Sequence, residues 1–286
     1  MASVVLFPGL GSQYKGMGEG LFDRFPVLTA AASEILGYSI RDLCLNNPGG
    51  LLHAPLYSQP AVFTVNALKY RALCQESIGK EQEPDLAMGH NVGEYNALEA
   101  AGVFGFEAGL RLIHTRSRCT AGVSGEMTAV LGLTKWEIVE VLDSASLWDV
   151  ARASLNTPLQ TVLSGRSADI DHAEKLLFEA GAYDVRPLTL GAPFHSPLMA
   201  EAARAFGEAL GGVQFCPPRF PVISNCTARP YEVERVAETL VRHIHQPVRW
   251  LQSIRWVFGH YPEADFTEVG DCRILRKILR QIISPY

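Results

Sequence analysis

The sequence predicts an α/β fold in which a small subdomain is inserted into a larger one that carries a parallel sheet. Two observations predict it. Strand-like runs alternate with amphipathic helices over residues 1–124 and again over 191–286, whereas residues 125–190 follow a β-α-β-β-α-β order. A chain of 286 residues is also long enough for one large α/β unit with an inserted piece.

The first part of the large subdomain begins with a short apolar run, residues 3–7, that Pro8 and Gly9 stop. This run predicts a strand that enters a loop. A second strand, a sharp turn and a helix are predicted over residues 85–104. Apolar residues at helical spacing predict further helices over 59–75 and 106–119.

The inserted subdomain is predicted from a change of pattern after residue 125. Strands are predicted over residues 127–133, 148–155, 159–165 and 183–190. Helices are predicted over 134–145 and 167–182. This order is the ferredoxin-like arrangement, which usually forms a compact unit.

The last part of the chain returns to alternating elements. Helices are predicted over residues 196–210, 233–244, 248–259 and 272–282, and strands over 220–225 and 265–270. No linker rich in proline, glycine or serine separates this part from the insertion. We therefore expect the two subdomains to pack together, with a cleft where they meet.

Composition excludes several classes of protein. A net charge of −5 leaves no basic footprint for nucleic acid, and no apolar run reaches the roughly 18 residues of a membrane span. Six cysteines without a C-x-x-C pair favour reduced thiols, and His243 and His245 lack a carboxylate or cysteine at metal-ligand spacing. We expect a cytoplasmic monomer with no nucleic-acid, membrane or metal partner.

The segment Gly89-His90-Asn91-Val92-Gly93 has the spacing of a nucleophile elbow, in which a serine sits on a tight strand-to-helix turn. This spacing makes the large subdomain α/β-hydrolase-like. Asparagine tolerates the positive φ of such a turn but has no nucleophilic oxygen. The amide of Val92, at a helix N-terminus, is placed to donate to an oxyanion.

Three other segments are candidates for the same site. Gly9 and Gly11 allow a tight loop over residues 7–13 whose N–H groups are free to face an anion. His195 lies at a loop-to-helix junction, which suits a general base, although a lone histidine there is more often a surface or capping residue. Arg116 lies on an apolar helix face and needs either a structural carboxylate or a bound one.

Taken together, these blocks resemble the malonyl-CoA:acyl carrier protein transacylases, and among them the discrete acyltransferases that serve polyketide synthases in trans. The resemblance covers essentially the whole chain. It rests on the order and spacing of FPGLGSQYKGMG, QPAVFTVNAL, GHNVGEYNALEAAGVF, NTPLQTVLSG, PFHSPLM, FPVISNCTARP, QPVRWLQSI and FTEVG. The β-α-β-β-α-β insertion is also a feature of that family.

The resemblance implies a ping-pong transfer of malonyl from coenzyme A to the phosphopantetheine thiol of an acyl carrier protein or a synthase carrier domain. The only small molecule implied is the coenzyme A thioester substrate, with no cofactor. By similarity, His195 is the catalytic histidine, oriented by a main-chain carbonyl near Arg249, and Arg116 pairs with the malonyl carboxylate.

The resemblance also assigns the groups around the acyl chain. Phe194 leaves no room for an α-methyl branch, and the amides of Leu10 and Val92 form the oxyanion hole. His90 belongs to the G-H-x-x-G-E pattern, where it either packs beside the elbow or contacts the bound acyl group. Asn156 and Gln160 are expected to be structural.

Two residues depart from the family pattern. Leu10 replaces a glutamine, which removes a side chain near the thioester but keeps the backbone donor. Asn91 replaces the serine, which predicts that the acyl-enzyme route is closed. Three hypotheses remain: a transacylase scaffold with a replaced nucleophile, a thioester hydrolase that uses His195, and a non-catalytic homologue that binds carrier proteins.

Overall fold

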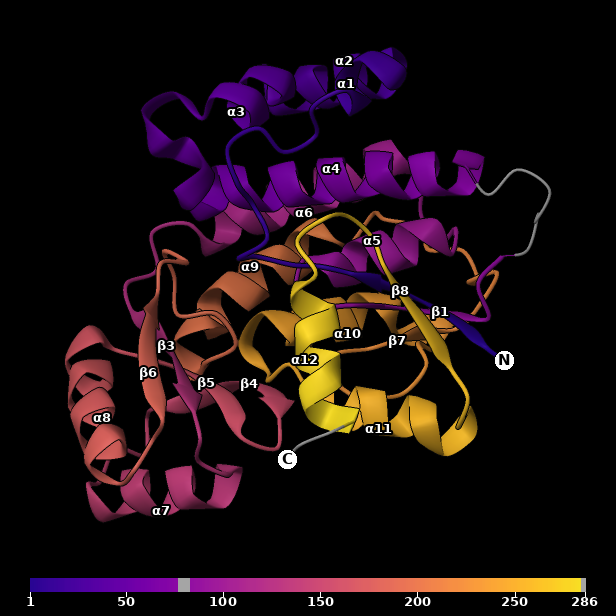
Figure 1. Cartoon of the computed structure of the whole chain (residues 1–286). Helices are drawn as coiled ribbons and strands as arrows, with labels where there is room; N and C mark the ends of the chain where they lie inside the picture. The colour runs from indigo at the N-terminus through magenta and orange to yellow at the C-terminus, as the bar shows by residue number, and fades with distance from the viewer. Residues whose placement is uncertain (77–82, 284–286) are drawn as a thin grey trace.

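Two four-stranded sheets organise the protein, whose structure is a computed structural model that describes residues 1–76 and 83–283 (Figure 1). The larger sheet is parallel, in the order β7-β2-β1-β8. Its strands are β1 (Ser3–Phe7), β2 (Leu86–Gly89), β7 (Val222–Ile223) and β8 (Asp265–Glu268). The smaller sheet is antiparallel, in the order β4-β5-β3-β6.

Helices cover both faces of the parallel sheet because its strands are apolar on both sides. Val4 and Leu6 of β1 pack with α11 (Trp250–His260) and α12 (Ile274–Ile283). Val5 and Phe7 point the other way, into the main core. That core is formed with α4 (Pro55–Glu76), α5 (Gly93–Ala100) and α6 (Phe106–Thr120).

The small sheet is built from one continuous stretch of chain. Its strands are β3 (Glu126–Leu131), β4 (Ala151–Thr157), β5 (Gln160–Gly165) and β6 (Asp184–Leu188). The helices α7 (Lys135–Ser144) and α8 (Ser167–Glu179) lie beside it at the lower left of Figure 1 and bury a core of their own. Thr134 and Glu137 form a capping box that starts α7. The predicted fold class is confirmed, ferredoxin-like order included.

The remaining elements differ from the predictions in detail. Before α4 the chain forms α1 (Leu21–Arg24), α2 (Pro26–Leu36), α3 (Ile40–Asn46) and the 3-10 helix η1 (Pro48–His53), none of which was predicted. After β6 it forms η2 (Pro197–Met199), α9 (Ala200–Ala209), η3 (Val233–Arg235) and α10 (Val236–His245). The helix predicted over 248–259 begins only at Trp250, because Val248 pairs with a strand instead.

That pairing joins the small sheet to the segment just before α11. The N–H of Leu155 in β4 donates to the carbonyl of Val248 at 2.9 Å, and the N–H of Val248 donates back to Ala153 at 2.9 Å. The small sheet is therefore held against the start of α11, close to the carboxyl ends of the parallel strands. Within the described residues, no helix has the length and hydropathy that crossing a membrane requires.

Candidate active site

The elbow forms where β2 runs directly into α5, and Asn91 at its tip has a φ of 52°. Its two glycines are required by close packing. A Cβ on Gly89 would lie 1.9 Å from the carbonyl carbon of Gly93, and one on Gly93 would lie 2.1 Å from the carbonyl oxygen of Phe7. Only glycine fits at either position, so the spacing of the motif is fixed by the turn itself.

The loop after β1 packs against this turn. A Cβ on Gly9 would lie 2.0 Å from the carbonyl oxygen of His90. The next residue, Leu10, thereby comes close to Asn91, and both line one cavity. Among the described residues, no acceptor is found for the main-chain N–H of Leu10 or of Val92. Two backbone donors near the elbow are thus available to a ligand oxygen.

His195 is held by the end of α10. Its own N–H donates to the carbonyl of Ile244 at 3.0 Å, and its Nδ1 lies 2.7 Å from the carbonyl oxygen of His243 and 3.0 Å from that of Gln246. Both ring contacts are acceptors, so Nδ1 carries the hydrogen and Nε2 is left with its lone pair. Nε2 is buried and has no partner in the described part of the chain.

The prediction that a carbonyl near Arg249 orients this histidine is wrong in position. The carbonyl of Arg249 accepts from the N–H of Ser253, inside α11. The last carbonyls of a helix lack intrahelical donors, and Pro247 has no N–H to offer His243. The free carbonyls at the end of α10 are therefore the ones that bind the ring.

Burial keeps the His195 ring neutral. It lowers the pKa of His195 well below 6.5, and the nearby His243 and Arg116 lower it further. The ring of His243 lies 4.9 Å from that of His195, centre to centre. A neutral imidazole with a free Nε2 is the form that can accept a proton.

Arg116 of α6 is fully buried, and its guanidinium contacts the elbow. Nη2 donates to Asn91 Oδ1 at 3.0 Å, and Nη1 donates to Gln59 Oε1. Gln59 is held in turn by Thr120, whose Oγ1 accepts from Nε2 of Gln59 at 3.0 Å. No carboxylate of the described residues lies within ion-pair distance of Arg116. Burial lowers the pKa of Arg116, and the neighbouring Tyr95 and Glu94 oppose that effect.

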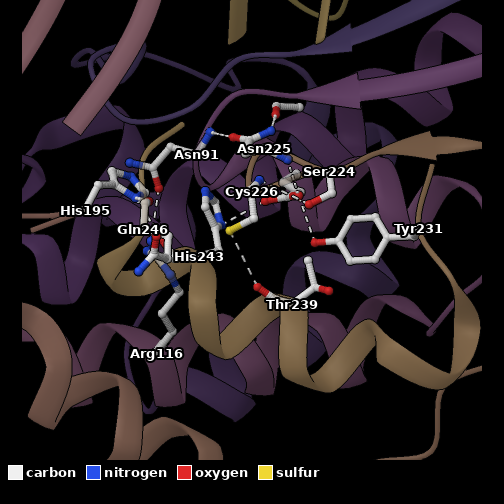
Figure 2. A network of polar contacts seen from close by, with 12 residues as sticks. Asn91, Arg116, His195, Ser224, Asn225, Cys226, Tyr231, Thr239, His243 and Gln246 are labelled. Carbon is white, nitrogen blue, oxygen red and sulfur yellow. Dashed lines mark hydrogen bonds and ion pairs between the residues drawn. The ribbon is translucent and has the colours of Figure 1, made fainter. Parts of the chain in front are cut away.

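A buried polar network holds the elbow in place (Figure 2). Asn225 accepts from the N–H of Asn91 at 2.9 Å and donates to the carbonyl of Gly89 at 2.6 Å. Glu94 Oε1 accepts from the N–H of Asn225 and from the hydroxyl of Tyr231, both at 2.8 Å. Its Oε2 lies 2.8 Å from Nδ1 of His243. Asn91, His195 and Arg116 lie together on one side of this network, and Tyr231 lies on the other.

Sequence reasoning missed this network. No role was assigned from the sequence to Asn225 or Tyr231. One signal was present: Asn225 closely follows β7, and the carboxyl ends of neighbouring parallel strands meet at one edge of a sheet.

A cavity of about 190 Å³ opens between the two sheets, and its lining includes four predicted site residues: Leu10, His90, Asn91 and His195. Arg116, Phe194, Val92 and Arg249 are not part of its lining. Phe194 instead packs over Arg116, with 5.5 Å from its ring centre to the guanidinium carbon. Larger hollows of about 590 and 550 Å³ lie around Lys69 and Arg71, away from the elbow.

The small sheet supplies the opposite wall of the cavity through Ser154, Asn156 and Gln160. Nε2 of His90 lies 2.9 Å from Asn156 Oδ1, so the residue after Gly89 is tied to β4. Asn156 is thus structural, as expected, but it also faces the cavity. Gln160 Oε1 is buried with no partner among the described residues. Within those residues, no cluster of histidine, cysteine and carboxylate side chains could hold a metal ion.

Comparisons with known proteins agree on one family. The family described as "Acyl transferase domain" matches residues 4–270. The polyketide biosynthesis malonyl CoA-acyl carrier protein transacylase PksC of Bacillus subtilis is 42% identical over 282 residues, which cover 97% of this chain and 96% of PksC. The polyketide biosynthesis protein PksE of the same organism is 41% identical over 281 residues, 97% of this chain but only 36% of PksE.

Solved structures give the same result. A malonyl CoA-acyl carrier protein transacylase from Burkholderia pseudomallei superposes with a TM-score of 0.95 at 41% identity, over 100% of this chain and 99% of the other. A malonyl-transacylase solved in complex with a type II polyketide synthase acyl-carrier protein superposes with a TM-score of 0.91 at 30% identity, over 99% and 93% of the two chains.

Proposed function

This chain belongs to the acyl transferase domain family, and from that premise we propose that it is a malonyl transacylase of polyketide biosynthesis whose elbow nucleophile is replaced. Its substrate is malonyl-CoA, and the acceptor is the phosphopantetheine thiol of an acyl carrier protein or synthase carrier domain. With Asn91 at the elbow, the chain binds the thioester but does not form an acyl-enzyme.

One observation carries the proposal: a fully buried arginine beside the elbow that no carboxylate of the described residues pairs with. A buried cation without an anionic partner is costly, and a protein retains one where a ligand supplies the anion. The malonyl carboxylate is such an anion, and an acetyl group is not. The guanidinium of Arg116 therefore selects for a carboxylated acyl group.

The other groups have roles consistent with acyl transfer. The N–H groups of Leu10 and Val92 hold the thioester oxygen, where negative charge develops. In Asn91→Ser, Nε2 of His195 would accept the proton of the introduced hydroxyl as its oxygen attacks the thioester carbon, and would return that proton to the leaving thiolate of coenzyme A. Phe194 packs over the guanidinium, so a branched acyl group that reaches Arg116 would meet its ring, which favours malonyl over branched acyl groups.

The test is restoration of the nucleophile. Asn91→Ser should form a malonyl ester on the introduced serine when incubated with malonyl-CoA, seen by intact-mass analysis, and should transfer it to a carrier protein. The unaltered chain should stay unmodified, and Asn91→Ser combined with His195→Ala should lose the adduct. An adduct on the unaltered chain, or none on Asn91→Ser, would overturn the proposal.

A second function is favoured by one observation: the free Nε2 of His195 at the cavity. A neutral imidazole there can take a proton from water, whose oxygen then attacks the thioester carbon and releases the free acid and the thiol. Steady release of coenzyme A by the unaltered chain, lost in His195→Ala, would support hydrolysis. Carrier-protein binding without turnover in Asn91→Ser would favour the non-catalytic alternative.

We also propose the cytoplasm as the compartment and a monomer as the functional state. Six unpaired cysteines are consistent with a reducing compartment. We divide the chain into a large acyltransferase subdomain, residues 1–124 and 191–286, and a small one, residues 125–190. All four strands of the antiparallel sheet come from within the small one, which supports this division.

A further inference from the structure

We propose that Asn91 closes the carboxylate site of this chain: its side-chain oxygen takes the place of an acyl carboxylate on Arg116 and competes with carboxylated substrates. This inference rests on the proposed function, since it concerns the same arginine. It makes Asn91 a determinant of specificity as well as a missing nucleophile. The consequence is a weakened preference for malonyl over acetyl thioesters.

The donors of the Arg116 guanidinium are only partly occupied. Nη1 donates to Oε1 of Gln59. Nη2 is bound by Asn91 Oδ1 at 3.0 Å, and Nε is buried with no acceptor among the described residues. Nε and Nη2 form one edge of the guanidinium, the edge to which a carboxylate binds with both oxygens. In this chain that edge is half occupied by the Asn91 amide.

The side chains of Gln59 and Asn91, which both accept from Arg116, differ in how easily a ligand can displace them. Gln59 is anchored through its own nitrogen to Thr120, inside the core. Asn91 makes no other side-chain hydrogen bond within the described residues. Its backbone is fixed by Asn225 on the N–H and by the N–H of Glu94 on the carbonyl, the latter at 3.0 Å. A carboxylate therefore displaces Asn91 by side-chain rotation alone, while the elbow keeps its shape.

The competition affects only ligands that need Arg116. An acetyl thioester uses the cavity and the N–H groups of Leu10 and Val92, and leaves the contact between Asn91 and Arg116 intact. A malonyl thioester must first break that contact. The binding free energy of malonyl-CoA is therefore less favourable by the contribution of one hydrogen bond to a charged group. The binding free energy of acetyl-CoA is unaffected.

The experiment is calorimetric titration of malonyl-CoA and acetyl-CoA into the unaltered chain and into Asn91→Gly. Glycine keeps the positive φ of the elbow, removes the carboxamide and brings no nucleophile. Malonyl-CoA should bind roughly tenfold more tightly to Asn91→Gly, the equivalent of one charged hydrogen bond, and acetyl-CoA should change little. Asn47→Gly is the matched control, because Asn47 also has a positive φ, 49°, but ends α3 far along the chain from the elbow.

A second variant tests the same contact in the opposite direction. Asn91→Asp places a fixed carboxylate on Arg116, so malonyl-CoA should bind no more tightly than acetyl-CoA. Equal gains for both thioesters in Asn91→Gly, or no gain for malonyl-CoA, would overturn the inference. If Asn91→Ser still acquires malonyl, the proposed function survives that result. If Asn91→Ser stays unmodified and no variant binds malonyl-CoA, the proposed function fails and the inference fails with it.

Discussion

Asn91 and His195 share an uncommon backbone conformation, with φ values of 52° and 60°. Non-glycine residues adopt it at a cost and keep it only where the surroundings hold them. Here the main-chain N–H of Asn91 donates to the side-chain oxygen of Asn225, and the main-chain N–H of His195 donates to the carbonyl of Ile244. Two strained residues that meet at one cavity are typical of a functional site.

The lowered pKa of His195 gives a pH prediction. Because burial keeps its pKa well below 6.5, the ring remains neutral, and able to accept a proton, in mildly acidic solution. In Asn91→Ser, the rate of malonyl-adduct formation should therefore stay level as the pH falls from 8 through about 6.5, and decrease only at lower pH. Quenched-flow mass analysis measures this profile. A loss of rate centred at or above pH 6.5 would contradict it.

The elements bring distant residues to one edge of a sheet. Three adjacent parallel strands, β7, β2 and β1, lead into Asn225, the elbow and the Leu10 loop. The site is thus built where strands end, which is why short motifs separated by more than a hundred residues converge. Each loop depends on its neighbour: Asn225 binds the elbow, and Gly9 packs against it.

Close packing at the elbow predicts that a single added methyl group at Gly93 strongly lowers the stability of the fold. Gly93→Ala would place a Cβ 2.1 Å from the carbonyl oxygen of Phe7, so β1 and α5 would have to separate. We expect this variant to lose more than about 3 kcal/mol of stability or to fail to fold. Gly259→Ala is the control, because Gly259 is exposed in α11 and a Cβ there meets no neighbour within 4 Å among residues 1–76 and 83–283. It should be neutral or stabilising in thermal unfolding; equal behaviour of the two variants would refute this account.

The support of the elbow by Asn225 predicts a second effect. Asn225→Ala leaves the N–H of Asn91 and the carbonyl of Gly89 without their partner, both in the interior. Two unsatisfied buried groups should cost about 2–4 kcal/mol in denaturant unfolding. Asn46→Ala removes an exposed side-chain bond to Asp42 and should change stability by less than about 0.5 kcal/mol. A similar, small change in both variants would mean that Asn225 does not support the elbow.

Sequence patterns predicted the elements that carry a clear apolar stripe or a motif, and missed those that do not. The helix α2 buries only Ala32 and Leu36, so its apolar pattern is too weak to read. The partner of His195 was placed near Arg249, because motif similarity does not show which carbonyls a helix end leaves free. Pro247 could have indicated the correct carbonyl. A proline has no N–H, so it leaves the carbonyl of His243 without its usual helical donor. The pairing of Asn225 with the elbow depends on strand order, which no local pattern encodes.

At the scale of the whole molecule, the cavity exists because two sheets of different kinds are held together beside it. The parallel sheet carries the elbow, and the antiparallel sheet carries the facing wall. Backbone bonds join β4 to Val248, and the His90 ring joins the elbow to Asn156. The fold class followed from the order of elements. The contact between the small sheet and the rest of the chain did not, because it depends on backbone and side-chain bonds between residues far apart in the sequence. The boundaries at 124 and 190 and the monomeric state stay predictions.

The contact between sheets predicts a stability effect in the small subdomain. Asn156→Ala removes the acceptor 2.9 Å from Nε2 of His90, a ring whose pKa burial lowers below 6.5. The ring nitrogen then keeps only Ser154 Oγ, at 3.3 Å, and the Ser154 hydroxyl loses Asn156 as its acceptor. This should cost about 1–3 kcal/mol, and Asn91→Ser should form its adduct more slowly when Asn156→Ala is added. Ser144→Ala, on the exposed side of α7, is the control and should change neither unfolding nor adduct formation. No effect of Asn156→Ala on either measurement would contradict the prediction.

The position of β1 in its sheet has a consequence for biosynthesis. β1 pairs on one edge with β8, so Ser3 lies opposite Asp265, whereas the antiparallel sheet needs only the chain between residues 126 and 188. A ribosome therefore delivers every strand of the smaller sheet long before it delivers the second neighbour of β1. Until then, the edge of β1 that later pairs with β8 is unpaired and accessible to chaperones and to other nascent chains. The cavity beside the elbow also lacks the part of its lining that α12 supplies. The enzyme's pocket is among the last parts of the molecule to mature.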